Sequence, residues 1–169
     1  SGNEGEEKAQ TTYNYNYAGD TIKTITSFTY TNDALTLSVT RKAANVTGDT
    51  AIVTLGVKKS ETVYTGNESE EKALATYNYN FDGNAIKTVT TFTYTNDALT
   101  LSVTNKVTNT TDVMANVISG AIKSKTVYTG NESEEKAQTT YNYNFDGTAI
   151  KTITSFFYTN DASTSSNTT

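Results

Sequence analysis

The feature that most constrains the fold is an internal repeat of 64 residues. The segment TGNESEEKA occurs at 65–73 and again, unchanged, at 129–137, and residues 65–105 match residues 129–169 at 31 of 41 positions. A repeat of this length is one supersecondary unit that buries its apolar side chains against its neighbours. The chain therefore divides into a first unit (1–64), a second unit (65–128) and a partial third unit (129–169).

The end of the third unit is more polar than the corresponding part of the second. A terminal repeat that loses its apolar row is typical of a cap or a frayed end. We therefore predict a polar C-terminal tail from about residue 162. The exchanged positions are Leu99, Leu101 and Val103 in the second unit and Ser163, Ser165 and Asn167 in the third.

Within one unit the apolar residues alternate with polar ones, which predicts β-strands rather than helices. The second unit has strand patterns over 73–81, 85–95 and 99–103, and a weaker hairpin pattern over 113–118 and 122–129. The Asp82-Gly83 step predicts a hairpin turn, because Gly accepts positive φ angles. We expect about five strands per repeat.

The apolar and aromatic side chains of these strands are expected to share one buried face. Hydrophobic residues make up only 35% of the chain, so a thin sheet or roll is favoured over one large core. The predicted fold is all-β, with tandem 64-residue repeats of antiparallel strands stacked into an elongated β-ribbon, roll or solenoid. The predicted core residues are Tyr77, Tyr79, Phe81, Ile86, Phe92, Tyr94, Leu99, Leu101 and Val103. Rows of Asn and Thr, such as Asn78 and Asn80, form ladders or a solvated face.

Composition argues against several classes of function. The net charge is −5, which disfavours nucleic acid and anionic membrane surfaces as partners. His and Cys are absent, so the commonest general base, the thiol nucleophile and the usual transition-metal ligands are missing. We therefore expect no enzyme and no cofactor. No apolar run approaches the length of a membrane span. The chain opens with Ser1-Gly2, which we interpret as a mature or excised fragment.

Four smaller motifs have ordinary structural explanations. The adjacent carboxylates of Glu70-Glu71 and Glu134-Glu135 would point to opposite faces of a strand, so they make poor acid–base pairs. Asp82 and Asn84 could coordinate calcium, but turn chemistry explains them better. A Lys–Asn isopeptide bond is conceivable, although no pairing can be named. Asn67 and Asn131 begin N-x-Ser sequons and are candidate glycosylation sites.

The segment 77–86 resembles the YD repeat of bacterial RHS-type proteins. Tyr77, Tyr79 and Gly83 match the motif, Asn80 stands where Asp is usual, and Ile86 comes one residue late. Related segments lie at 13–22, 92–99 and 141–150. The resemblance implies a bacterial scaffold, secreted or displayed on the cell surface, built from long β-strands. The regular 64-residue period is closer to a giant surface or filament protein than to a closed shell.

These observations favour a structural repeat of an extracellular fibre, filament or cell-surface stalk, rigidified by strand pairing between repeats. Its partners would be neighbouring repeats of a longer chain or other copies of itself. The alternative is an adhesin-type module that recognises a glycan or protein receptor through aromatic rows on an outer face. A third option is a subunit that assembles through its open end strands.

Overall fold

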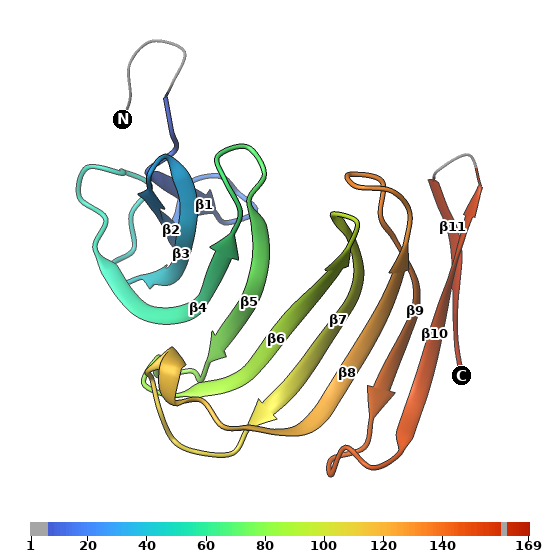
Figure 1. Ribbon diagram of the computed structural model, residues 1–169. Helices are drawn as coiled ribbons and strands as arrows, with labels where there is room; N and C mark the ends of the chain where they lie inside the picture. Colours follow the sequence, from blue (N-terminus) through green and yellow to red (C-terminus); the bar gives the residue numbers. More distant parts are fainter. Residues whose placement is uncertain (1–6, 160–161) are drawn as a thin grey trace. The chain divides into compact units, whose positions relative to one another are not determined.

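The computed structural model describes residues 7–159 and 162–169 and shows an all-β protein (Figure 1). Eleven strands form one open sheet, and their order in the sheet is their order in the sequence. Neighbouring strands pair in the antiparallel direction. The strands are β1 (Thr11–Tyr15), β2 (Ile22–Thr31), β3 (Ala34–Ala43), β4 (Leu55–Thr65), β5 (Lys72–Tyr79), β6 (Ile86–Thr95), β7 (Ala98–Val107), β8 (Ser119–Thr129), β9 (Lys136–Tyr143), β10 (Ile150–Thr159) and β11 (Ala162–Thr168).

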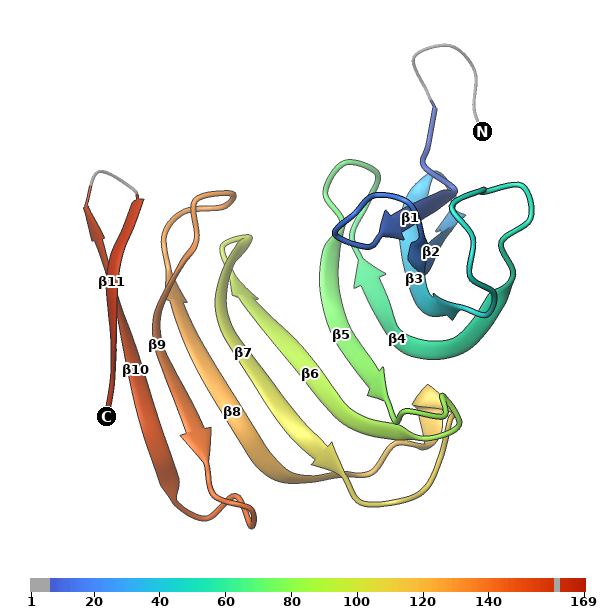
Figure 2. The same cartoon turned by 180° about the vertical axis from the view of Figure 1, so that it is seen from behind.

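The chain forms two compact units. The first contains the chain up to Lys87 together with Thr111–Met114, and the second contains Thr88–Thr110 and Ala115–Thr169. In the second unit, β7 to β11 lie side by side as one layer in both views (Figure 1 and Figure 2). The boundaries expected at residues 64 and 128 from the sequence repeat stay a prediction.

Buried side chains gather mainly in the first unit. Ile22 and Ile25 are 2% and 3% exposed, and Ile86 is 3% exposed. Among the described residues of the second unit, the buried hydrophobic side chains are Val89 and Ala98, at 4% and 6% exposed. A sheet that is one layer thick leaves most side chains half-buried, so neighbouring strands supply most of the packing.

The segment 65–129 contains four strands where five were predicted. Val113–Ile118 does not form a strand; it contains a short 3-10 turn at Met114–Asn116. The side chain of Asn109 accounts for this, since it donates to the carbonyl of Asn116 (2.7 Å) and accepts the N–H of Ile118 (2.9 Å). An Asn side chain that satisfies the backbone in this way offers the chain an alternative to strand pairing.

The predicted polar tail is a paired strand. Residues 162–168 form β11, which pairs with β10 through Thr154↔Thr168 and Phe156↔Ser166. Ladder hydrogen bonds come from the backbone, so a strand at the end of a sheet can pair without an apolar side-chain row. Residues 162–168 therefore form a strand, as the corresponding residues of β7 do, although the sequence has lost the apolar row.

The predicted core row is divided between the two faces of the sheet. Phe92 lies opposite Ser102, and Thr93 lies opposite Leu101. Because successive side chains alternate between faces, Phe92 and Leu101 lie on opposite faces, although one shared face was expected. Tyr79 is buried (8% exposed), while Tyr77, Tyr94, Leu99 and Val103 are half-buried.

Phe81 is wrongly predicted as a core residue. Strand β5 ends at Tyr79, and the turn begins at Asn80, whose carbonyl accepts the N–H of Gly83 (3.1 Å). The Asn80 side chain also accepts the N–H of Asn84 (3.0 Å). Phe81 thus sits in the turn and is 81% exposed.

Two kinds of turn need residues that accept positive φ. The β2–β3 hairpin turns at Asn32 and Asp33, with φ of 49° and 66°, and Asn96 and Asp97 repeat these angles between β6 and β7. Two consecutive positive φ angles indicate a type I′ turn, which matches the twist of the flanking strands. Gly83 has φ of 68° and approaches β4 closely: a Cβ there would lie 2.7 Å from the backbone nitrogen of Lys58.

We predict that Gly83→Ala destabilises the protein more than Gly19→Ala does. Both positions have positive φ (68° and 76°), which costs an alanine about 1–2 kcal/mol. At Gly19 an added Cβ meets nothing within 4 Å, whereas at Gly83 it overlaps β4, which adds about 1–3 kcal/mol. Urea unfolding measures the difference. Equal losses for the two variants would contradict the close approach at Gly83.

Candidate functional site

The most strongly buried ionisable groups in the described chain form a cluster in the first unit, which we call the Lys58–Glu61–Tyr79 cluster. Lys58 and Glu61 lie on β4, and Tyr79 is the last residue of β5. Glu61 is 7% exposed and Tyr79 is 8% exposed. A buried carboxylate is costly unless it is paired and hydrogen-bonded, so its partners decide what the cluster can do.

The three side chains satisfy one another. The Lys58 Nζ lies 3.1 Å from Glu61 Oε1, and it also donates to the Tyr79 hydroxyl (3.3 Å). The Tyr79 hydroxyl donates to Glu61 Oε2 and lies 3.1 Å from the backbone carbonyl of Asp112. A hydroxyl carries one proton, so at any moment Tyr79 donates to one of these two acceptors, the Glu61 carboxylate or the Asp112 carbonyl.

Burial and the hydrogen bond to Glu61 keep the Tyr79 hydroxyl protonated. Burial raises the pKa of the Tyr79 hydroxyl far above its usual value of 10.0, and the hydrogen bond to Glu61 raises this pKa further. The Tyr79 hydroxyl is therefore a hydrogen-bond donor and not a base at any ordinary pH. The arrangement holds β4, the end of β5 and the Asp112 carbonyl together, and its chemistry is that of a structural network.

Sequence reasoning missed this cluster, although it selected Tyr79 for the core. The corresponding positions 64 residues later are Ile122, Lys125 and Tyr143. The strands 55–65 and 119–129 are otherwise closely similar, so the exchange of Glu61 for Lys125 and of Lys58 for Ile122 marks a local difference in environment. A position-by-position comparison of the copies would have found it.

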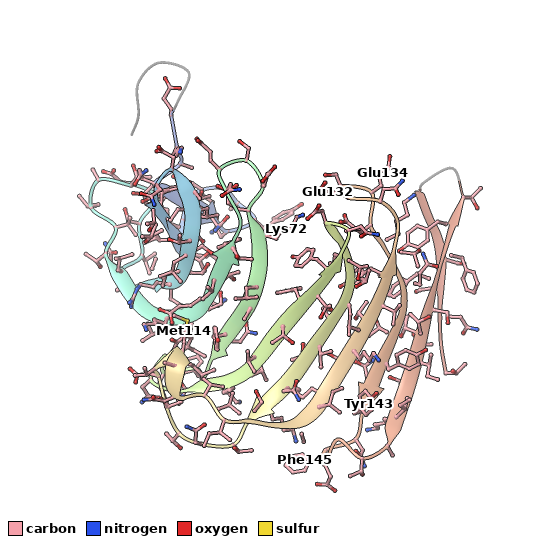
Figure 3. The ribbon with its side chains drawn as sticks, viewed as in Figure 1. Lys72, Met114, Glu132, Glu134, Tyr143 and Phe145 are labelled. Carbon is pink, nitrogen blue, oxygen red and sulfur yellow. The ribbon has the colours of Figure 1, made fainter. Side chains whose placement is uncertain are left out.

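Two exposed phenylalanine rings in turns, each in contact with a lysine, form a second candidate site, which we call the Lys–Phe pairs. The Nζ of Lys42 lies 3.7 Å from the centre of the Phe81 ring in the first unit. The Nζ of Lys106 lies 3.2 Å from the centre of the Phe145 ring in the second unit, and it also donates to the Phe145 carbonyl. Figure 3 shows Phe145 in the turn after β9. Such exposed cation–π contacts contribute about 0.5–1 kcal/mol each.

The predicted glycosylation and calcium positions lie in exposed turns. Asn67 and Asn131 are both exposed, and Asn131 lines a hollow of about 670 Å³ with Thr129, Gly130, Glu134 and Lys136. The side chain of Asn84 accepts a hydrogen bond from Asn80 (2.7 Å), so it serves its own turn. In residues 7–159 and 162–169, no group of three or more carboxylates could hold a metal ion.

The second carboxylate of each Glu-Glu pair connects two turns. Glu71 Oε1 accepts the backbone N–H of Leu35 (2.9 Å), and Glu135 Oε1 accepts that of Leu99 (3.0 Å). The hydrogen bond from Leu35 holds the pKa of the Glu71 carboxyl below its usual value of 4.5. These carboxylates therefore tie the start of β3 and of β7 to the loop that follows the next strand.

Comparisons with protein-family models, with the curated proteins and with the solved structures found no match. In the part of the chain that the structure describes, no helix is long and apolar enough to cross a membrane. The candidate sites are therefore interpreted from their own geometry.

We predict that Tyr79→Phe lowers the free energy of unfolding by about 1–3 kcal/mol, because Glu61 loses a partner while it stays buried. Tyr15→Phe is the matched control. The Tyr15 hydroxyl contacts the Gly48 carbonyl at 3.2 Å, but Tyr15 is 43% exposed, so water can replace this bond and the loss stays below about 1 kcal/mol. Denaturant unfolding of both variants at pH 7 measures the difference, and a Tyr79→Phe variant as stable as the wild type would contradict the network.

We also predict an acid-dependent loss of stability through Glu71. A carboxyl whose pKa is lowered in the folded state stabilises that state above its unfolded pKa, near 4.5, and this contribution disappears as the pH falls through the folded pKa. Glu71→Gln should therefore be less stable than the wild type at pH 7, and this difference should shrink as the pH falls below 4.5. Thermal unfolding across this pH range measures the effect, and parallel profiles for the two proteins would exclude it.

Proposed function

We propose that this chain is a structural segment of an extracellular fibre, filament or cell-surface stalk, in which β-strands pair continuously from one 64-residue repeat to the next. The observation that carries this proposal is the strand order of the sheet, in which strands that follow one another in the sequence are neighbours from β1 to β11. Such a meander can be lengthened by copying a set of strands, without any change in the connections.

Contacts that recur at the repeat spacing support a tandem arrangement. The N–H of Ile22 donates to Thr47 at 2.8 Å, and the N–H of Ile86 donates to Thr111 at 2.7 Å. The carboxylate bonds of Glu71 and Glu135 recur in the same way. In this proposal each repeat contributes four strands to an elongated β-ribbon.

Cross-strand threonine pairs, which we call the Thr pairs, supply side-chain links between neighbouring strands. The two hydroxyls of each pair lie 2.8–2.9 Å apart, and the two residues of each pair are 14 positions apart in the sequence. Each such pair stabilises the contact between its strands by about 0.2–1 kcal/mol. These links lie at alternate interfaces of the sheet, from β2–β3 to β10–β11, and such a distribution suits a mechanical role, since no single contact carries the whole load. The pairs are Thr26–Thr40, Thr62–Thr76, Thr90–Thr104, Thr126–Thr140 and Thr154–Thr168.

The likeness to YD repeats of bacterial RHS-type proteins agrees with this proposal, as does a location outside the cell or on its surface. Two motif residues have defined structural positions: Tyr79 closes β5 and Gly83 makes the positive-φ turn. Strand pairing and turn geometry account for both positions, which supports a structural role.

An adhesin-type module is the second candidate, and the Lys–Phe pairs favour it. Phe81 and Phe145 are 81% and 83% exposed, and Tyr17 occupies the corresponding place in the first copy of the repeat, fully exposed. Exposed rings at a regular spacing can stack on sugars or on a protein receptor. If this is the function, Phe81→Ala with Phe145→Ala should weaken binding on a glycan array strongly, while stability falls only by the two exposed cation–π contacts, about 0.5–1 kcal/mol each.

We predict that each additional copy of residues 65–128 lengthens the protein by about 19 Å, because four strands are added at about 4.8 Å per strand. Small-angle scattering of chains with one, two and three added copies measures the maximum dimension. The melting temperature should rise with the first copies, since each buries more repeat–repeat surface. A maximum dimension that does not grow with copy number would contradict the fibre proposal.

A further inference from the structure

We infer that the outer edge of β1 is a binding surface for a β-strand with the sequence pattern of β8, supplied by a further repeat. This inference rests on the proposed function and names the partner strand and its register. The partner is a strand in which Ser, a charged residue, Thr and Val follow one another, as at 60–63 and 124–127.

One eight-residue sequence occurs in two environments and acts as an internal control. Residues 8–15 and 136–143 both read KAQTTYNY. The second copy forms β9 over all eight residues, pairs with β8 and β10, and is half-buried throughout. The first copy forms β1 over only five residues, Thr11–Tyr15, pairs with β2 alone, and is mostly exposed. Because the sequences are the same, the difference comes from the neighbouring strand.

Among the described strands, β1 has a neighbour on one side only, which leaves particular backbone groups of its other edge without a strand partner. The N–H of Phe28 donates to the Gln10 carbonyl (3.0 Å), so Gln10 points its hydrogen-bonding groups toward β2. These groups alternate in direction along a strand, so those of Thr11 and Tyr13 point to the other side. On that side no described strand pairs with β1. An edge of this kind is a template for another strand.

The occupant and its register follow from β9. Lys125 pairs with Tyr141 and Val127 pairs with Thr139. The corresponding residues of β1 are Tyr13 and Thr11, so the incoming strand places its charged residue opposite Tyr13 and its Val opposite Thr11. The Thr126–Thr140 hydroxyl contact of 2.9 Å would recur at Thr12. Strand β4 meets β5 in the same register, through Glu61↔Tyr77 and Val63↔Ala75.

A second copy of the chain is a poorer occupant. The edge strand at the other end of the sheet is β11, which corresponds in the 64-residue repeat to β3 and β7. Those two strands pair with β4 and β8. Head-to-tail contact would place β11 directly beside β1, a pairing that the described sheet does not contain. The outer edge of β11 also suits a β8 strand less well, because Ser165 replaces the Leu101 that lies opposite Val127.

A synthetic peptide of residues 119–129 tests the inference on the intact protein. We expect the peptide to bind and to slow hydrogen exchange at the Thr11 and Tyr13 amides, as followed by NMR. The N–H of Val127 faces β9 in the sheet and that of Thr126 faces β7, so each can be blocked separately. N-methylation at Val127 should weaken binding about tenfold or more, whereas N-methylation at Thr126 should have little effect.

The same experiment identifies the outcomes that would overturn the inference. Equal binding by the two methylated peptides, protection of β11 in place of β1, or no binding at millimolar peptide would each exclude the proposed edge. Self-association of the protein alone, with the same amides protected, would make a second copy the occupant. Peptide binding and the increase of length with copy number are measured independently. The edge inference can therefore fail while the fibre proposal stands, and the fibre proposal can fail while the edge inference stands.

Discussion

Backbone pairing between strands that are adjacent in the sequence is the constraint on which this protein depends. In an open sheet each inner strand satisfies its backbone groups with the strand before it and the strand after it, and the described strands β2 to β10 follow that rule, while β1 and β11 lie at the two edges. The layer of β7–β11 shows the consequence for side chains, most of which remain half-buried. Cross-strand pairs such as Thr90–Thr104 therefore supply part of the side-chain stabilisation that a buried core supplies in a two-layer fold.

The first unit departs from this simple scheme at the Lys58–Glu61–Tyr79 cluster. There, one sheet face contains a carboxylate that is paired and hydrogen-bonded out of contact with water. The second unit has Ile122 and Lys125 at those positions. Removing one partner of a buried ion pair is costly even when the pair itself adds little to the net free energy of folding. The cluster therefore contributes more to the choice of local packing than to the overall stability.

Strand locations were largely predictable because alternation and turn chemistry are local signals. The strand expected over 85–95 is β6 (Ile86–Thr95), and the turn expected at Asp82-Gly83 has Gly83 at a φ of 68°. The errors arose where a side chain competes with strand pairing: Asn109 holds 113–118 out of the sheet, and Asn80 starts the turn before Phe81. Neither competition is visible in a hydrophobic pattern.

By itself the sequence determined the all-β class, the 64-residue spacing and the places where the chain reverses, because period-two alternation and positive-φ residues act over a few neighbours. Only the tertiary structure decided which face each side chain occupies, as Phe92 and Leu101 show, because a face depends on register across strands. It also decided that one KAQTTYNY segment is covered and the other open, since that difference lies in the neighbouring strand and not in the eight residues themselves.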